Sequence, residues 1–195
     1  MIKDRFFYPL AACFVAVIVG FALSFGENVE LSEREIWTNG YVMAGEDLSR
    51  LTAQPGTQAI FVASSNGQPA YARLSSTAAR ASLPSDKPGV FAPIGPQYEA
   101  AFAGRDLRLT ITARASAING LKVFDMGYFT DGSGDSAWLR KPLGTNWSEY
   151  VMTFRPRELT DRRGLDYFSI WPGETAEVLN MDVKEMRIEV LNPPT

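Results

Sequence analysis

The stretch that most limits how this chain can fold lies at residues 106–130, DLRLTITARASAINGLKVFDMGYFT. Apolar and polar side chains alternate along 107–114, which is typical of a strand with one buried face. The run 123–129 also alternates, but side chains on both of its faces are largely apolar. Asn119-Gly120 lies between the two runs, and Asn-Gly tolerates the positive φ angles of a tight hairpin turn. The stretch therefore predicts a β-hairpin, and we place it at the centre of a β-sandwich.

Short apolar runs separated by turn residues continue on both sides of this stretch. Candidate strands are the runs 36–43, 58–63, 70–75, 90–94, 98–102, 137–140, 150–155, 165–171 and 181–191, and we expect eight or nine strands in all. The run 58–63 is almost continuously apolar, so we expect it to be a buried strand. In the last run the apolar parity shifts near Lys184-Glu185, which is the signature of a β-bulge. No long helix is predicted after residue 35, and the pattern predicts an all-β, antiparallel sandwich of jelly-roll type.

Several of these segments together resemble a known family. They are GVFAPIGPQYEAAFAGRDLRLTITARA, Trp138, LGTNWSEYVMTF, LDYFSIWPGE and MDVKEMRIEV. Their long central strand, their tryptophan-bearing loop before a Tyr-x-Met-x-Phe strand and their bulged last strand resemble the jelly-roll carbohydrate-binding modules, which have a galactose-binding-domain-like fold. The resemblance spans residues 36–191 and implies sugar binding, often with one structural calcium ion. Many proteins of this fold bind no sugar, so the fold alone does not assign the function.

Aromatic side chains are the first candidates for a sugar site, because sugar rings stack on them through their C–H faces. The candidates are Trp147, Trp138, Trp171, Tyr128 and Tyr98. Trp138 and Trp147 flank one loop, and we expect that they can line one patch. A sandwich of this size also needs buried aromatic residues in its core. Trp147 is the best candidate for the surface, since it stands between two polar loop residues.

Acidic residues suggest where a calcium ion would bind. The loop 131–135 begins like a calcium loop, but Ser136 and Pro142 stand where an EF-hand needs Gly and Glu. The resemblance instead places calcium near Asp182 in the last strand, with Glu46 as a partner. No cofactor other than this calcium is expected.

The N-terminal part predicts a membrane helix. Residues 6–25 carry no charge over 20 positions, a length of roughly 30 Å that matches the hydrocarbon core of a bilayer. Lys3 and Arg5 precede this run, and acidic residues follow it. The positive-inside rule places residues 1–25 as a cytoplasmic tip and a single span of the inner (cytoplasmic) membrane. Residues 26–35 are then a juxtamembrane linker, and the sandwich at 36–195 is periplasmic or extracellular.

Two alternatives compete with a retained membrane helix. Ala22-Leu23-Ser24 can be a signal-peptide cleavage site, although the apolar run is longer than a usual signal sequence. Leu10-Ala11-Ala12-Cys13 resembles a bacterial lipobox but lies too close to the basic end. If the helix is retained, small residues recur on one face of it at every fourth position, which favours close packing against a partner helix. They are Ala12, Ala16, Gly20 and Ser24.

Composition restricts the function. The chain of 195 residues has no histidine, one cysteine and a net charge of −3. Nucleophilic triads that use histidine or a soluble cysteine are therefore excluded, and the charge argues against nucleic-acid binding. A hydrolase with paired carboxylates is a third and weaker hypothesis. We expect no enzyme but an accessory or structural subunit of a larger membrane complex, which contacts lipid and other transmembrane subunits. The alternative is a membrane-anchored periplasmic module that binds a glycan.

Overall fold

The computed structural model describes residues 14–15, 31–65, 67–82, 88–130, 134–158, 165–173 and 178–193, and it divides into two units, Met1–Leu31 and Ser32–Thr195. In the first unit the described residues are Phe14 and Val15, which are helical. No helix among the described residues is long and apolar enough to cross a membrane. The rest of the predicted span at 6–25, with Ala12, Ala16, Gly20 and Ser24, lies outside the described residues, so the span stays a prediction.

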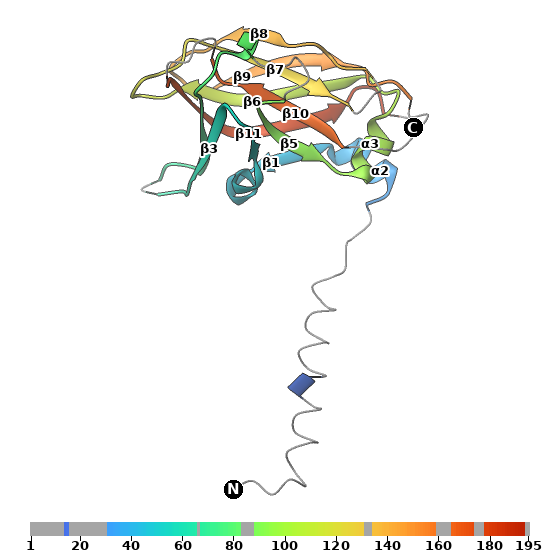
Figure 1. The fold of residues 1–195 in the computed structure, drawn as a ribbon. Helices are drawn as coiled ribbons and strands as arrows, with labels where there is room; N and C mark the ends of the chain where they lie inside the picture. The colour runs from blue at the N-terminus through green and yellow to red at the C-terminus, as the bar shows by residue number, and fades with distance from the viewer. Residues whose placement is uncertain are drawn as a thin grey trace, which may run out of the picture. The chain divides into compact units, whose positions relative to one another are not determined.

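The second unit is a sandwich of two antiparallel sheets (Figure 1). Sheet A has the order β3(Thr57–Val62), β4(Tyr71–Ser76), β11(Asn180–Val190), β6(Leu107–Ala115) and β9(Ser148–Phe154), with β1(Tyr41–Ala44) also paired to β11. Sheet B has the order β2(Thr52–Ala53), β5(Val90–Ile94), β10(Asp166–Trp171), β7(Val123–Phe129) and β8(Leu139–Pro142). The helices are α2(Glu33–Asn39) and α3(Pro96–Phe102), and the 3-10 turns are η1(Gly45–Arg50) and η2(Arg80–Ser82). The predicted all-β sandwich is confirmed.

The core lies between the sheets and follows the alternation of the sequence. Along β6, Leu107, Leu109 and Ile111 are fully buried between the sheets. The predicted bulge in β11 is also confirmed, since its register against β6 shifts between Val183 and Glu185. The bulge lets the apolar side chains on both sides of it face the same core.

The predicted hairpin at Asn119-Gly120 is wrong. β6 belongs to sheet A and β7 to sheet B, so residues 116–122 cross from one sheet to the other. Asn119 has φ 52°, but its carbonyl oxygen accepts a hydrogen bond from the N–H of Asn180 at 2.7 Å. The loop is therefore tied to the start of β11. Both edges of β6 are occupied by β11 and β9, which leaves no edge for β7 to pair with.

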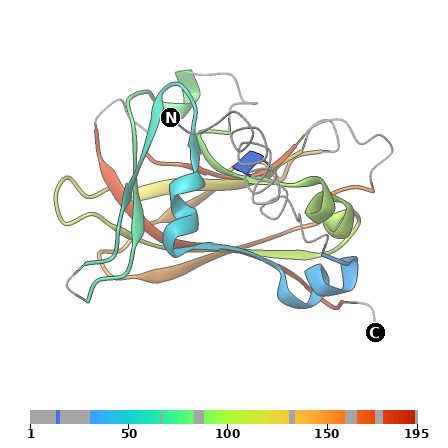
Figure 2. The ribbon, with the colours of Figure 1, turned by 90° about the horizontal axis from the view of Figure 1, so that it is seen from below.

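Two expected strands are helices instead. Part of 36–43 forms α2, where Ser32 and Glu35 make a capping box that satisfies backbone N–H groups at the helix start. Gly40, at φ 67°, ends this helix and turns the chain into β1. The expected strand 98–102 lies in α3, which has proline at its first position. α2 and α3 lie at the same end of the sandwich (Figure 2), and Trp37 Nε1 donates to the carbonyl oxygen of Ala101 at 2.7 Å.

The run 58–63 forms β3, but it is not a buried strand. β3 is at the edge of sheet A, and Ile60 is 58% exposed. The run 58–63 is apolar although β3 is not covered on both faces. How the other strands pair decides whether a strand lies at the edge of a sheet, and the run itself does not record this. The remaining expected strands are present, with bounds shifted by a few residues.

Candidate functional site

The outer face of sheet A carries a row of charged side chains. The register places Ile60 of β3 opposite Arg73 of β4, Arg73 opposite Asp182 of β11, and Asp182 opposite Arg114 of β6. Directly opposed residues point to the same face of a sheet. The four side chains therefore form one row across four strands.

Asp182 is the centre of this row. Its side chain is fully buried, and it accepts hydrogen bonds from Arg73 Nε at 2.9 Å and from Arg114 Nε at 3.3 Å. The hydrogen bond to Asp182 raises the pKa of Arg73, whose guanidinium also donates to the hydroxyl of Tyr71 at 3.1 Å. The buried carboxylate is thus neutralised by two guanidinium groups.

These surroundings do not suit the calcium ion expected at Asp182. Both carboxylate oxygens already accept guanidinium N–H groups, and Glu46 is exposed in η1. In the described part of the chain, no group of three or more acidic, histidine or cysteine side chains is placed to hold a metal ion. The calcium ion stays a prediction, which these contacts of Asp182 do not favour.

Trp147 is half-buried beside this row. The guanidinium of Arg114 lies 4.4 Å from the centre of its ring, and the ammonium of Lys184 lies at 5.5 Å. The ring of Tyr71 meets Trp147 at 6.3 Å with an angle of 62°. We call Tyr71, Arg73, Arg114, Trp147 and Lys184 the Trp147 cluster. Lys184 is the residue where the β11 register shifts, and a bulge re-aims the side chain it carries.

The outer face of sheet B is aromatic. We call Phe91, Phe129, Trp138, Tyr167 and Trp171 the aromatic face. Trp138 lies 4.7 Å from Phe129 and 6.4 Å from Trp171, measured between ring centres. Phe91 and Tyr167 meet at 4.7 Å. Gly127 of β7 leaves room for this arrangement, because a Cβ atom there would lie 2.8 Å from the ring of Phe129.

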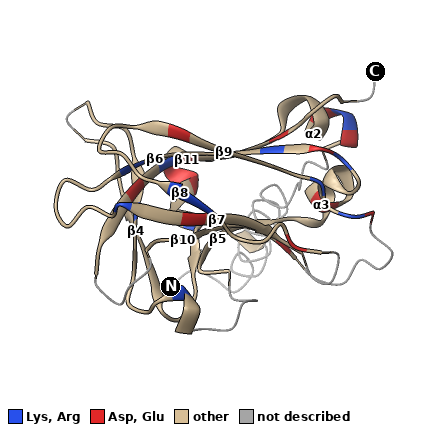
Figure 3. Ribbon diagram, turned by 90° about the horizontal axis from the view of Figure 1, so that it is seen from above, with Lys and Arg blue, Asp and Glu red and all other residues tan. Residues whose placement is uncertain are grey.

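A second buried aspartate lies next to the aromatic face. Asp125 of β7 accepts hydrogen bonds from Arg80 Nε at 2.8 Å and from Arg140 Nε at 3.0 Å. The hydrogen bond to Asp125 raises the pKa of Arg140. The guanidinium of Arg80 also lies 5.8 Å from the ring centre of Trp138. Acidic and basic segments accordingly lie close together on strands of both sheets (Figure 3).

Three buried polar atoms at sheet B have no hydrogen-bond partner among the residues that the structure describes: Trp138 Nε1, Ser169 Oγ and Trp171 Nε1. Register places Ser169 opposite Gly127 and Trp171 opposite Asp125, so Ser169 and Trp171 share the outer side of the sheet with Asp125. A buried donor without a partner costs about 1–3 kcal/mol. A ligand or a water molecule that brings oxygen atoms to this face would recover that cost.

Two of the remaining sugar candidates, Trp171 of the aromatic face and Tyr128, are fully buried. Tyr128 faces the core, where its hydroxyl donates to Asp166 Oδ2 at 2.7 Å, and burial raises its pKa well above the usual range. The N–H of Asp166 donates to Glu99 Oε1 at 2.7 Å. Tyr128 is therefore no surface platform. The ring of Trp171 is also fully buried.

Tyr98 lines a separate hollow of about 400 Å³. Its ring meets that of Tyr41 at 5.2 Å and 89°, and Asp47, Arg50 and Gln97 also line the hollow. Burial raises the pKa of Tyr41 to about 12.

The structure also separates the two tryptophans expected in one patch. Trp138 belongs to the aromatic face of sheet B, and Trp147 stands on the outer face of sheet A. No motif of the sequence predicted Arg80, Asp125, Arg140 or Ser169 as a site residue. One signal was available, because Asp125 is the charged residue within the apolar run 123–129 and needs a partner when buried.

Comparison with known proteins yields likeness in structure alone. No family model and no curated protein matches the sequence. The second xylan-binding module (CBM22-2) of Paenibacillus barcinonensis Xyn10C superposes with a TM-score of 0.55 at 12% identity, over 77% of this chain and 99% of that one. The C-terminal family 22 carbohydrate-binding module of Clostridium thermocellum Xyn10B gives 0.52 at 15% identity, over 80% and 95%. A structure described as the xylan-binding domain of family 22 gives 0.53 at 14%, over 80% and 97%.

The sandwich has the fold of a jelly-roll carbohydrate-binding module. The fold-level resemblance found in the sequence is thereby confirmed. At these identities the likeness describes the path of the chain and carries no residue-by-residue assignment.

Proposed function

We propose that this protein is a non-catalytic carbohydrate-binding module and that the aromatic face of sheet B holds the glycan. The observation that carries the proposal is the combination found on that face. Aromatic rings, three buried polar atoms without a partner in the described part of the chain and the Arg80–Asp125–Arg140 set lie on one side of one sheet. Several modules of the same fold are described as xylan-binding, which supports a saccharide as the ligand.

This face offers both kinds of contact that a saccharide needs. The half-buried rings of Trp138 and Tyr167 can accept the apolar C–H side of a sugar ring, while guanidinium, carboxylate and indole groups bond to its hydroxyl groups. The guanidinium of Arg80 covers Trp138, so a sugar reaches that ring when Arg80 turns away. The side chain of Arg80 is 34% exposed, which leaves it room to turn toward solvent.

The uncharged run 6–25 bears on where the proposed module is located. We propose that it holds the protein in the cytoplasmic membrane as a single span, with the sandwich on the periplasmic or extracellular side. A role as a subunit of a larger membrane complex, with other transmembrane subunits as partners, stays a prediction that rests on this run and on its small residues.

Binding of the full chain to a panel of soluble neutral polysaccharides, including xylan, tests the proposal. The protein is kept in a detergent without a sugar headgroup, because a maltoside would compete for the site. We expect binding to at least one polymer and a loss of affinity of about tenfold or more in Trp138→Ala, as for a central aromatic contact. Ile118→Ala is the matched control, since Ile118 is 74% exposed in the loop between β6 and β7. Binding that is unchanged in Trp138→Ala, or absent from the whole panel, would contradict the proposal.

A further inference from the structure

The Trp147 cluster contains three cations, and the acid that forms ion pairs with them among the described residues is Asp182. Asp182 contacts Arg73 and Arg114 but not Lys184. In the next row of the same face, Glu185 pairs with Arg187, and Glu149 stands opposite Thr112. The whole chain, in contrast, has a net charge of −3. A local excess of cations on an acidic protein favours an anionic ligand at this place.

Arg114 and Lys184 have nitrogen atoms that can bind such a ligand. Arg114 donates to Asp182 through Nε at 3.3 Å, and its terminal nitrogens have no hydrogen-bond partner in the described ranges. The ammonium of Lys184 lies against the ring of Trp147 and forms no ion pair with any described residue. A guanidinium fixed at one end and stacked on an aromatic ring is preorganised to bind a carboxylate through its other nitrogens.

The aromatic rings of the cluster indicate which kind of anionic ligand fits it. Trp147 and Tyr71 lie beside the cations, and the edge residue Ile60 is exposed at the end of the same row. A sugar acid presents an apolar C–H side and a carboxylate together, so it complements rings and cations in one ligand. The bulge at Lys184 is part of the arrangement, because it places one extra side chain between β4 and β6 on the outer face.

We propose that the Trp147 cluster is a second binding site, on the sheet opposite the aromatic face, for a saccharide that carries carboxylate groups. Arg114 and Lys184 bind the carboxylate, and Trp147 with Tyr71 contacts the sugar ring. Asp182 holds Arg73 and Arg114 in place as a positioning residue. This site does not depend on the aromatic face, so the two proposals can fail separately.

The test compares acidic polysaccharides with their methyl esters, which lack the negative charge and carry one added methyl group per carboxylate. Polygalacturonate, alginate and hyaluronan are titrated against the full chain in a detergent without a sugar headgroup, each beside its methyl-esterified form. We expect binding of at least one acid, at least about tenfold weaker binding of its ester, and a marked loss of affinity between 50 and 300 mM salt, as ion pairing requires. Equal affinity for acid and ester, or no binding of any acid, would overturn the proposal.

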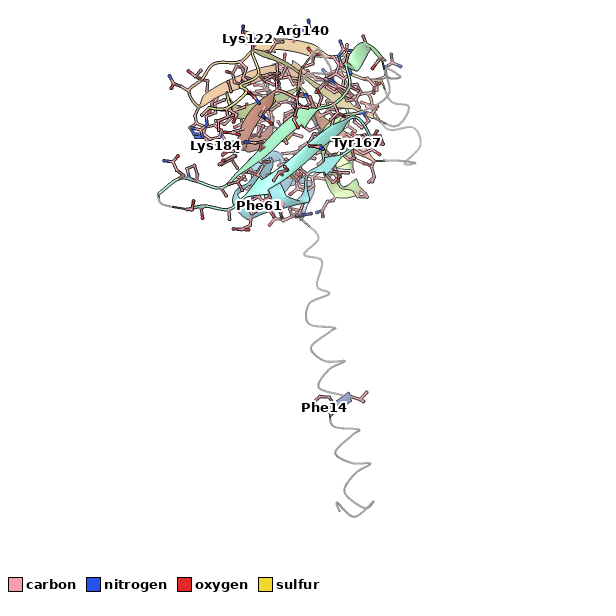
Figure 4. All side chains as sticks on the ribbon, turned by 60° about the vertical axis from the view of Figure 1, so that its left-hand side comes forward. Phe14, Phe61, Lys122, Arg140, Tyr167 and Lys184 are labelled. Carbon is pink, nitrogen blue, oxygen red and sulfur yellow. The ribbon has the colours of Figure 1, made fainter. Side chains whose placement is uncertain are left out.

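Matched variants then locate the site. Lys184→Gln and Trp147→Ala should each weaken binding of the acid by about fivefold or more. Lys122→Gln, which removes one exposed lysine apart from Lys184 (Figure 4), should leave the affinity unchanged. Trp138→Ala should also leave it unchanged, which separates this site from the aromatic face. An equal loss in Lys122→Gln would show general charge attraction and overturn the proposal.

A lipid headgroup is the competing source of negative charge. Short-chain phosphatidylglycerol is therefore added as a competitor to the bound acid. We expect the acidic saccharide to stay bound when the lipid is present at a concentration similar to that of the saccharide. Displacement by the lipid at lower concentrations than by galacturonate oligomers would overturn the proposal in favour of a membrane surface. Thermal unfolding of each variant is measured alongside, and Lys184→Gln is the deciding variant because Lys184 holds no ion pair among the described residues.

Discussion

Each sheet of the sandwich holds one buried aspartate between two arginines on its outer face, and the two sets are built differently. The Asp182 side chain is 1% exposed, and its partners Arg73 and Arg114 are 36% and 29% exposed. The Asp125 side chain is 4% exposed, and its partners Arg80 and Arg140 are 34% and 51% exposed. In sheet A both arginines come from neighbouring strands, at positions directly opposite the aspartate.

In sheet B one arginine comes from a neighbouring strand and the other from outside the sheet. Arg140 stands opposite Asp125 in β8, whereas Arg80 begins η2 and lies 45 positions away in sequence. The first set is therefore a consequence of strand register, while the second also holds a connecting segment against the aromatic face. The difference suggests that Asp182 contributes more to stability and that Asp125 contributes more to the shape of the proposed glycan site.

The largest effect is expected from Asp182→Asn. The change leaves two guanidinium groups side by side without a counter-charge, and we expect a loss of about 2–4 kcal/mol in the free energy of unfolding. This expected loss is smaller than the loss for breaking a fully buried ion pair, because solvent screens the partly exposed arginines. Urea unfolding measures it. A loss no larger than that of Asp125→Asn would remove the distinction between the two sets.

Asp125→Asn should cost less, about 1–2 kcal/mol, because Arg140 can turn into solvent. It should also change the intrinsic tryptophan fluorescence, since Arg80 lies over Trp138 and loses its partner. Because Arg114 likewise lies over Trp147, both variants are made in a Trp147→Phe background. The same change in Asp182→Asn would then contradict the role assigned to Arg80.

Lysine substitutions sharpen the comparison further. Arg73→Lys should cost about 1 kcal/mol, because one ammonium cannot keep the contacts of Arg73 with Asp182 and with the Tyr71 hydroxyl in the same geometry. Arg140→Lys should cost under about 0.5 kcal/mol, since that side chain is the most exposed of the four. The same urea titration measures both variants, and a reversed order would show that exposure does not govern these pairs.

A buried acid that accepts a backbone N–H gives the smallest expected effect. Glu99 is buried and accepts the N–H of Asp166, and burial raises its pKa above the usual 4.5. The folded state therefore holds this proton more tightly than the unfolded state does. Its contribution to stability is complete below pH 4.5 and is lost as the pH rises through the higher pKa of the folded state. The difference in free energy of unfolding between Glu99→Gln and the native chain should therefore be more favourable to the variant at pH 7 than at pH 4. A gain that does not depend on pH would contradict the shift.

The sequence by itself determined the features that depend on periodicity. Alternation along 107–114 placed Leu109 and Ile111 in the core, and the change of parity near Lys184 located the bulge in β11. These features could be predicted because a strand turns its side chains to alternate faces at every residue, whatever its partners are. The capping box at Ser32 and Glu35 was equally local and could have been found in the sequence.

Tertiary structure alone decided which strands pair and what meets on each face. Asn119-Gly120 fits a hairpin locally, but β11 and β9 take both edges of β6 and send β7 to the other sheet. Trp138 and Trp147 are 9 positions apart in the sequence and yet lie on opposite outer faces. Asp182 finds Arg73 across 109 positions. Such pairings bring together residues far apart in the sequence, in competition with other possible partners. The free energy of closing those long loops is not visible in any local pattern of residues.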